Sequence, residues 1–125
     1  MADSPSRLTL PRSRRLRTGR DFSRPRTDGK RLVLGCLILN WLPLESGGVS
    51  RLGVVTSKKV GGAVIRNRCR RLMREVYRLH QLELAQPMDL VMVARPSMAN
   101  KTFGQIERDF LTAMRQSRLW ASPAQ

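Results

Sequence analysis

The chain has 125 residues, a length suited to one domain with one modest hydrophobic core. Its 24 basic and 9 acidic residues give a net charge of +15 at pH 7, and twenty of the basic residues are arginine. Such an excess opposes compaction by self-repulsion, which argues against a self-contained small-molecule enzyme and favours an anionic partner, either a nucleic acid or a membrane surface.

The apolar segments are too short to favour the membrane. The longest apolar run, residues 32–41, is interrupted by Gly35 and Asn40 and falls well short of the ~20 residues of a spanning helix. The basic N-terminus is not followed by the apolar stretch of a secretion signal. We therefore expect a cytoplasmic protein whose partner is a nucleic acid.

The beginning of the chain predicts little fixed structure. Residues 1–17 are polar and basic and indicate a disordered arm, followed by one domain over residues 18–120 and a tail over residues 121–125. Thr18 can cap a short helix, which Pro25 is expected to end after one or two turns.

The rest of the chain alternates strands and helices. Residues 31–40 predict a first strand and residues 49–57 a second, and their close spacing suggests that the two form an antiparallel hairpin. Residues 63–80 predict the main helix, residues 89–95 a further strand, and Thr102, in a capping-box pattern, begins the last helix. This order predicts an α/β or α+β two-layer sandwich.

The main helix separates an apolar face from a basic one. Apolar positions repeat at 4-3-4-3 spacing and predict the core face: Ile65, Cys69, Leu72, Val76 and Leu79. The opposite face carries Asn67, Arg70, Arg71, Arg74 and Arg78, with Arg66 and Arg68 on its two flanks. Like charges four residues apart on a helix are destabilising, so this concentration needs an explanation.

A phosphate-contacting surface is the explanation we favour over a merely solvated face. The arginine fork binds phosphate at two points and also stacks on bases. Lys58 and Lys59 precede the helix together with Gly61 and Gly62, whose backbone could approach a phosphate closely or simply form a flexible turn. Charge alone does not distinguish RNA from DNA.

Residues 57–75 resemble the signature of the protein component of bacterial ribonuclease P. The hallmark of that family is an Arg-Asn-Arg triplet followed by two basic residues, a leucine and an arginine. Here these positions are Arg66, Asn67, Arg68, Arg70, Arg71, Leu72 and Arg74. Residues 51–59 also resemble the strand and connector of the family, and the weaker resemblance extends over about residues 15–120.

The resemblance implies a fold and a role. The fold is an α+β two-layer sandwich of order αβββαβα, similar to a ribosomal protein domain, with a left-handed β-α-β crossover where general rules would predict a right-handed one. The role is that of a subunit that partners ribonuclease P RNA and precursor tRNA, but neither DNA nor membrane. In that family the RNA holds Mg²⁺ and removes the 5′ leader by hydrolysis, while the protein alone binds no cofactor.

The resemblance also assigns two surfaces. The surface for the catalytic RNA comprises Lys58, Lys59, Arg66, Asn67, Arg68, Arg70, Arg71 and Arg74. The leader is expected in a cleft between the first helix and the sheet, with Phe22, Arg26, Arg31 and Gly35. Arg26 and Gly35 stand where relatives often carry aromatics, so arginine stacking or charge could replace aromatic stacking. A core role for Phe22 is nearly as plausible.

No catalytic or metal-binding set is evident in the sequence. The single histidine, His80, is expected to be structural, and Glu107 and Asp109 would project to different sides of a helix. One alternative is a ribosomal-type structural RNA-binding protein, which would share the composition. A DNA-binding regulator would need a helix-turn-helix pair or a dimer interface, and the sequence suggests neither.

Overall fold

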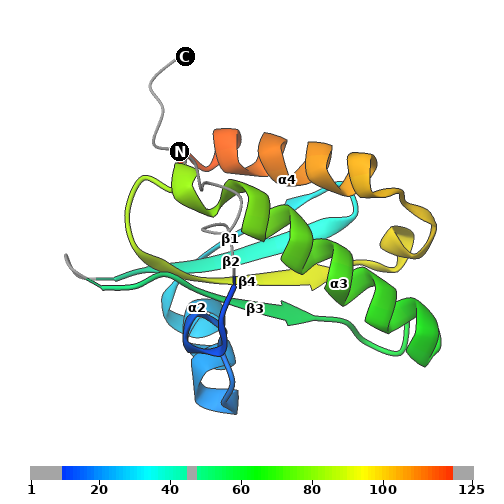
Figure 1. Ribbon diagram of the computed structural model, residues 1–125, viewed down its shortest axis with the longest axis horizontal. Coiled ribbons are helices and arrows are strands. Elements are labelled where there is room, and N and C mark those ends of the chain that lie inside the picture. Colours follow the sequence, from blue (N-terminus) through cyan, green and yellow to red (C-terminus); the bar gives the residue numbers. More distant parts are fainter. Residues whose placement is uncertain (1–9, 45–47, 120–125) are drawn as a thin grey trace.

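The structure, a computed structural model, describes residues 10–44 and 48–119. Its main elements are α2 (Gly19–Asp28), β1 (Lys30–Leu34), β2 (Leu37–Pro43), β3 (Arg51–Val55), α3 (Ala63–His80), β4 (Met88–Ala94) and α4 (Phe103–Gln116). Short 3-10 turns occur at η1 (Arg12–Arg14), η2 (Gln81–Glu83) and η3 (Pro96–Asn100). The expected order αβββαβα is confirmed (Figure 1). Within the described stretches, no helix is long and apolar enough to cross a membrane.

The four strands form one sheet of order β1-β2-β4-β3. β2 pairs antiparallel with β1 and β4, whereas the edge strand β3 runs parallel to β4. α3 connects these two parallel neighbours and passes in front of the sheet in the view of Figure 1, so the crossover is left-handed. This confirms the handedness expected from the family resemblance.

The prediction of one strand over residues 31–40 is wrong, because the run folds into the β1–β2 hairpin. Gly35 takes a φ of +56° at the first position of the two-residue turn, a conformation that glycine adopts without strain. The second position, Cys36, is apolar and buried, so composition does not reveal the turn. The predicted pairing of residues 31–40 with residues 49–57 is also wrong, since β4 lies between β2 and β3.

α2 is longer than predicted, because Pro25 lies inside the helix. Thr18 caps the first turn, where its Oγ1 accepts a hydrogen bond of 3.1 Å from the Asp21 N–H. Proline lacks a backbone N–H and so removes one helical hydrogen bond, which is why it is normally disfavoured inside a helix. Pro25 is nevertheless buried in the protein, so tertiary packing retains the helix through Asp28.

Residues 10–17, predicted as part of a disordered arm, are instead ordered along the edge of β3. The Leu16 N–H donates to the Leu52 carbonyl at 2.8 Å, and Arg15 forms an isolated parallel β-bridge with Leu52. Leu10 and Leu16 are buried, which supplies the stabilisation that a wholly polar arm would lack. Residues 1–9 and 120–125, including the predicted tail, lie outside the described residues.

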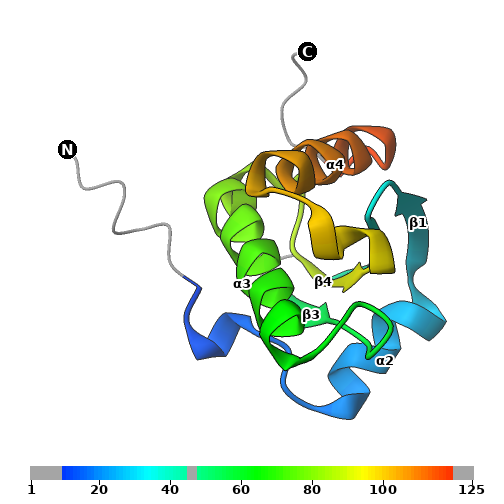
Figure 2. The ribbon, with the colours of Figure 1, turned by 90° about the vertical axis from the view of Figure 1, so that its right-hand side faces the viewer.

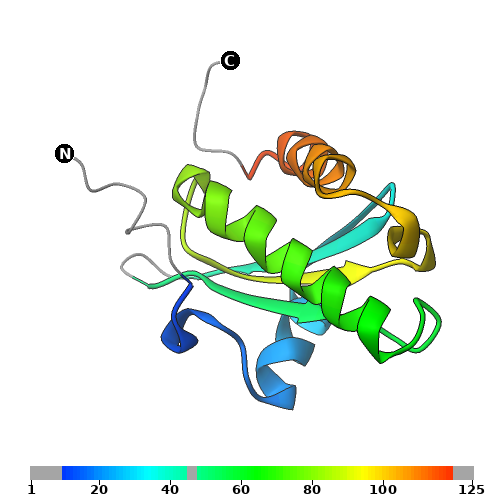
Figure 3. The same cartoon turned by 45° about the vertical axis from the view of Figure 1, so that its right-hand side comes forward.

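The hydrophobic core lies between the sheet and the layer formed by α3 and α4, whereas α2 packs on the other face (Figures 2 and 3). Strand alternation sends Leu32, Leu39 and Met92 into the core. The neighbouring positions point to the α2 side, among them Arg31 and its cross-strand partner Asn40. Because α2 is short, part of this second face stays open.

The buried face of α3 differs from the predicted stripe. Cys69, Met73, Val76 and Tyr77 are buried, whereas Ile65 is 38% exposed. At 100° per residue, the buried face is rotated by about 65° from the predicted one. As a result Arg66 and Arg70 lie at the border of the packed face and are half-buried instead of fully exposed.

His80 joins the end of α3 to α4 through two carboxylates. Its Nε2 lies 2.7 Å from Oε2 of Glu107 on α4, and its Nδ1 lies 3.1 Å from Oε2 of Glu83. Partial burial alone would lower the pKa of His80, but the hydrogen bonds to Glu107 and Glu83 outweigh it and raise the pKa above its ordinary value.

Stability should therefore fall as the pH rises through the pKa of folded His80. The contribution of the imidazolium is complete below the unfolded pKa of ~6.5 and is lost at higher pH. We expect the free energy of unfolding of the wild type to drop by about 1 kcal/mol more than that of His80→Gln across this range. Urea unfolding at pH 6.0 and 8.5 measures the difference, and parallel pH profiles of the two proteins would contradict the prediction.

Candidate nucleic-acid interface

Most arginines of α3 have no carboxylate partner in the part of the chain that the structure describes. Arg78 pairs with Glu75, with Nη2 and Oε2 2.6 Å apart. Within residues 10–44 and 48–119, no ion pair joins a carboxylate to any of Arg66, Arg68, Arg70, Arg71 or Arg74. Their charge is therefore available to a partner outside the chain.

Neutral groups hold two of these arginines in place. The Arg70 Nη1 donates to Thr56 Oγ1 at 2.6 Å, and its Nη2 donates to the Asn67 side-chain oxygen. On the other flank, Arg68 Nη2 donates to the Lys101 carbonyl at 2.8 Å. Such partners orient a guanidinium without neutralising it, which reduces the entropy lost when the side chain binds phosphate.

Arg74 belongs to a cationic cluster. Burial lowers the pKa of its guanidinium, and the nearby charges of Arg15 and Arg70 lower it further. Arg74 remains charged at neutral pH, because an arginine loses its proton only in strongly alkaline solution. The repulsion within the cluster would be relieved by an anion, which is the electrostatic property expected of a phosphate-binding surface.

The loop before α3 extends this surface. Lys58 and Lys59 are exposed there, at the end of the protein where β3 leads into α3 (Figure 1). Gly62 occupies the N-cap position of α3, where its carbonyl accepts from the Arg66 N–H at 2.9 Å but no side chain accepts from the first backbone N–H groups of the helix. The structure thus places all eight residues predicted to bind the catalytic RNA on α3 or on the loop that precedes it.

The N-terminal segment contributes cations that the sequence analysis missed. Arg12, Arg15 and Arg17 line a cavity of about 190 Å³ beside β3, together with Arg74 of α3 and Phe22 of α2. This cavity connects the basic side of α3 to the α2 side of the sheet around the edge strand. The apolar residues Leu10 and Leu16, unusual in a polar arm, were the available signal that this segment docks on the domain.

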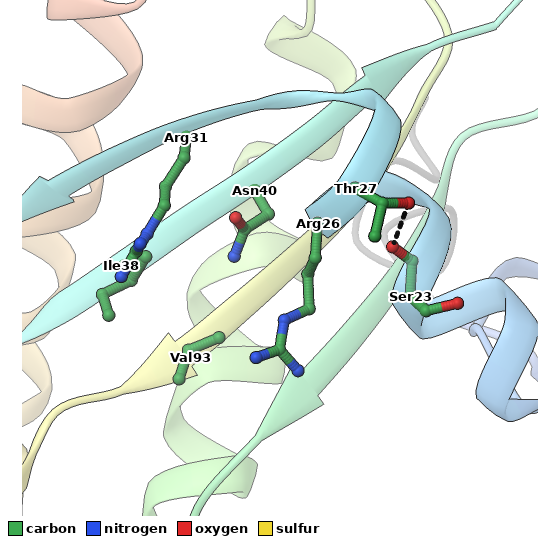
Figure 4. Close-up of a pocket in the computed structure, with 7 residues that line it drawn as sticks. All are labelled: Ser23, Arg26, Thr27, Arg31, Ile38, Asn40 and Val93. Atoms are coloured by element: carbon green, nitrogen blue, oxygen red, sulfur yellow. Dashed lines mark hydrogen bonds between the residues drawn. The ribbon is translucent and has the colours of Figure 1, made fainter.

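A larger cavity of about 440 Å³ opens between α2 and the exposed part of the sheet. Figure 4 shows its lining, which comprises Ser23, Arg26, Thr27, Arg31, Ile38, Asn40 and Val93. The structure therefore brings together two of the four residues predicted for the leader, Arg26 and Arg31. Within the described residues neither guanidinium pairs with a carboxylate.

The other two predicted residues lie outside this cavity. Phe22 packs on Gly53 of β3, where a Cβ atom on the glycine would come within 2.4 Å of the Phe22 ring, and it lines the smaller cavity instead. Gly35 forms the β1–β2 turn, where an added Cβ would lie 2.1 Å from Oδ2 of Asp109. The same carboxylate accepts a hydrogen bond of 2.9 Å from the Cys36 N–H, so Gly35 serves the packing of the turn on α4.

Acidic and metal-binding side chains do not gather at either surface. In the described part of the chain, no three His, Cys, Asp or Glu residues converge as a metal site. The two surfaces offer cationic side chains that can bind phosphate and a cleft that is bordered by arginines, and this combination is suited to binding RNA.

Comparison with known proteins identifies the family. The sequence model of the family Ribonuclease P matches residues 10–118. The ribonuclease P protein component of Roseiflexus castenholzii is 40% identical over 99 residues, 78% of this chain and 80% of that protein. The component of Syntrophomonas wolfei is 34% identical over 115 residues, 92% of this chain and 96% of that protein. The Staphylococcus aureus RNase P protein has the same fold, with a TM-score of 0.78, 24% identity and coverage of 86% of this chain and 97% of that one. The chain therefore belongs to the ribonuclease P protein family.

Proposed function

We propose that this protein subunit of ribonuclease P docks the catalytic RNA on α3 and the preceding loop. The RNA-binding residues are Lys58, Lys59, Arg66, Asn67, Arg68, Arg70, Arg71 and Arg74. The single observation that carries the proposal is the set of α3 arginines without a carboxylate partner among the described residues. Family membership favours this role over that of a ribosomal-type structural protein.

The cleft beneath α2 is the proposed site for the single-stranded 5′ leader of precursor tRNA. Arg26 and Arg31 border it and can contact successive phosphates, while Ile38 and Val93 give it an apolar floor. Phe22 lies beside the cleft in the cavity that leads to Arg74. The smaller cavity therefore carries basic residues from Arg74 on α3 around the edge strand β3 to α2, the helix that also borders the leader cleft.

The chemistry of leader removal is proposed to belong to the RNA partner and its Mg²⁺ ions. The described residues converge on no metal site, so no step is assigned to a carboxylate or histidine of this chain. The role proposed for the protein is to supply positive charge and to hold the leader in line with the RNA. We further propose a cytoplasmic location and a preference for structured RNA over duplex DNA, and a competition assay measures the latter.

A steep salt dependence tests the electrostatic interface. If five to seven of the proposed cations contact phosphates, the plot of log K against log salt should have a slope of about −3.5 to −6. Filter binding to a bacterial ribonuclease P RNA over 50–400 mM salt, roughly centred on physiological ionic strength, measures this slope. A slope shallower than about −1 would mean that phosphate contacts do not dominate the interface.

A further inference from the structure

Val64 is an apolar side chain that the fold leaves in solvent. It lies in the first turn of α3 and is 83% exposed, more than any other large apolar residue within residues 10–44 and 48–119. At 100° per residue it points about 165° away from the centre of the buried face of α3. That face is formed by Cys69, Met73, Val76 and Tyr77. A change of rotamer therefore cannot bring Val64 into the core.

The neighbouring Ile65 extends this apolar spot. Gly61 packs against Ile65, because a Cβ atom on the glycine would lie 3.0 Å from the Ile65 Cδ1 atom. The rest of the Ile65 side chain is uncovered, so that the residue is 38% exposed. Val64 and Ile65 together form a surface that we call the apolar tip of α3.

The first turn of α3 is not optimised for helix stability. A β-branched residue is a weaker helix former than glutamate, and the helix dipole would stabilise an acidic residue in this turn. The first turn of α3 nevertheless carries no acidic residue, and Gly62 provides no side-chain cap. An exposed valine at position 64 therefore stabilises the isolated protein less than an acidic residue would.

The surroundings of Val64 decide what its exposure means, because isolated apolar residues are common on protein surfaces. Residues three, four and seven positions along a helix lie on one face. From Val64 these are Asn67, Arg68 and Arg71, which all belong to the proposed surface for the catalytic RNA. The apolar tip is thus one end of a cationic face.

The charges around the apolar tip determine which partner fits it. Lys58 and Lys59 are exposed in the loop before α3 and border the tip on its other side. A second copy of this chain, with its net charge of +15, would place cations against cations. RNA fits both features, since its phosphates attract the cations while an unstacked base offers an apolar face.

We propose that the apolar tip of α3 packs against an unstacked nucleoside of the catalytic RNA. The inference rests on the proposed docking of that RNA on α3 and adds an apolar anchor to the cationic contacts. Phosphate contacts weaken with salt because they release counterions, whereas the burial of apolar surface releases none. The two kinds of contact can therefore be separated by a salt titration.

Filter binding of the full chain to a bacterial ribonuclease P RNA at several salt concentrations provides the test. Val64→Ser should raise Kd about fivefold to tenfold, as expected when most of a valine side chain is no longer buried. The loss should be the same at every salt concentration, so the plot of log K against log salt should run parallel to that of the wild type. Arg71→Gln, on the same face, should instead make the slope shallower by about 0.7–0.9.

Two further variants serve as controls. Val64→Ile keeps an apolar β-branched side chain and should bind within about twofold of the wild type. Leu82 is 72% exposed in η2, beyond the far end of α3, so Leu82→Ser makes the same kind of change outside the proposed surface and should leave Kd unchanged. Both serine variants should unfold at the urea concentration of the wild type, because the replaced side chains are largely exposed.

The outcomes separate the apolar contact from the function on which it rests. A wild type that binds the RNA with a slope shallower than about −1 would overturn docking on the cationic surface itself. If the wild-type slope is steep, unchanged affinity of Val64→Ser would overturn only the apolar contact, and so would a loss that is accompanied by a shallower slope. Sedimentation that shows the wild type self-associating and Val64→Ser monomeric would assign the tip to a second copy of the chain and would also overturn the inference.

Discussion

Replacing Arg51 with methionine is expected to lower the free energy of unfolding by about 3 kcal/mol. Arg51 holds Asp89 in a two-point contact, with Nε–Oδ1 and Nη2–Oδ2 distances of 3.0 and 2.8 Å. Asp89 is 1% exposed, so the substitution leaves a buried carboxylate without its counterion. We take the lower end of the usual range for such a loss because Arg51 itself is 32% exposed.

The same arginine also ties α2 to the sheet. Its Nη1 lies 3.5 Å from Oδ2 of Asp21 in the first turn of α2. Burial raises the pKa of Asp21, but the Arg51 charge and the hydrogen bonds with Thr18 outweigh it and keep this pKa below its ordinary value. Loss of Arg51 should therefore loosen the helix that borders the leader cleft.

Urea unfolding measures the loss, and a double variant identifies its cause. Arg51→Met combined with Asp89→Val removes both charges and should recover most of the stability, because an apolar pair replaces a buried ion pair at little cost. If the free energy of unfolding of Arg51→Met lies within about 0.5 kcal/mol of the wild-type value, the buried Asp89 carboxylate does not depend on Arg51 as its counterion.

The double charge reversal Arg70→Glu with Arg74→Glu should weaken binding to the catalytic RNA by about 100-fold or more. Each substitution removes a charge-assisted phosphate contact worth about 1.5–3 kcal/mol and adds repulsion. Folding should remain intact, because neither arginine pairs with a described carboxylate and Arg74 is repelled by Arg15 and Arg70. Filter binding at near-physiological salt measures affinity, and circular dichroism checks the fold.

A matched control separates the local contact from net charge. Arg108→Glu with Arg115→Glu makes the same change in charge on exposed positions of α4, outside the proposed surface. It should weaken binding by less than about tenfold through the long-range field alone. Equal losses in the two double variants would indicate non-specific attraction rather than docking on α3.

The long helix could be predicted from the sequence because its signals are local. Its bounds, Ala63–His80, and the capping box of Thr102 at the start of α4 are confirmed. The rotation of α3 about its own axis could not be predicted. Leu72 and Met73 are equally apolar, and which of the two is buried depends on the shape of the sheet against which the helix packs. Tertiary packing buries Met73 and Tyr77, whereas Leu72 and Leu79 of the predicted stripe are only partly buried.

The parts of the site that were missed depend on contacts between distant segments. Leu16 reaches Leu52 across 36 residues, and this contact, together with the burial of Leu10, places the arginines of the N-terminal segment beside Arg74. Asn40 joins Arg26 and Arg31 in one cleft because a turn at Gly35 turns β2 back along β1. Asn40, a polar residue within an apolar run, was a local sign of an exposed cleft, but its neighbours could not be known without the hairpin.

Cleavage of precursor tRNA in a reconstituted reaction tests most directly whether α3 is the docking surface for the catalytic RNA. The wild-type chain is mixed with a bacterial ribonuclease P RNA at a Mg²⁺ concentration too low for the RNA to act alone. Removal of the 5′ leader should be restored by the wild type and by Arg108→Glu with Arg115→Glu, but not by Arg70→Glu with Arg74→Glu at the same protein concentration. Restoration by all three proteins alike, or by none of them, would contradict the assignment of α3.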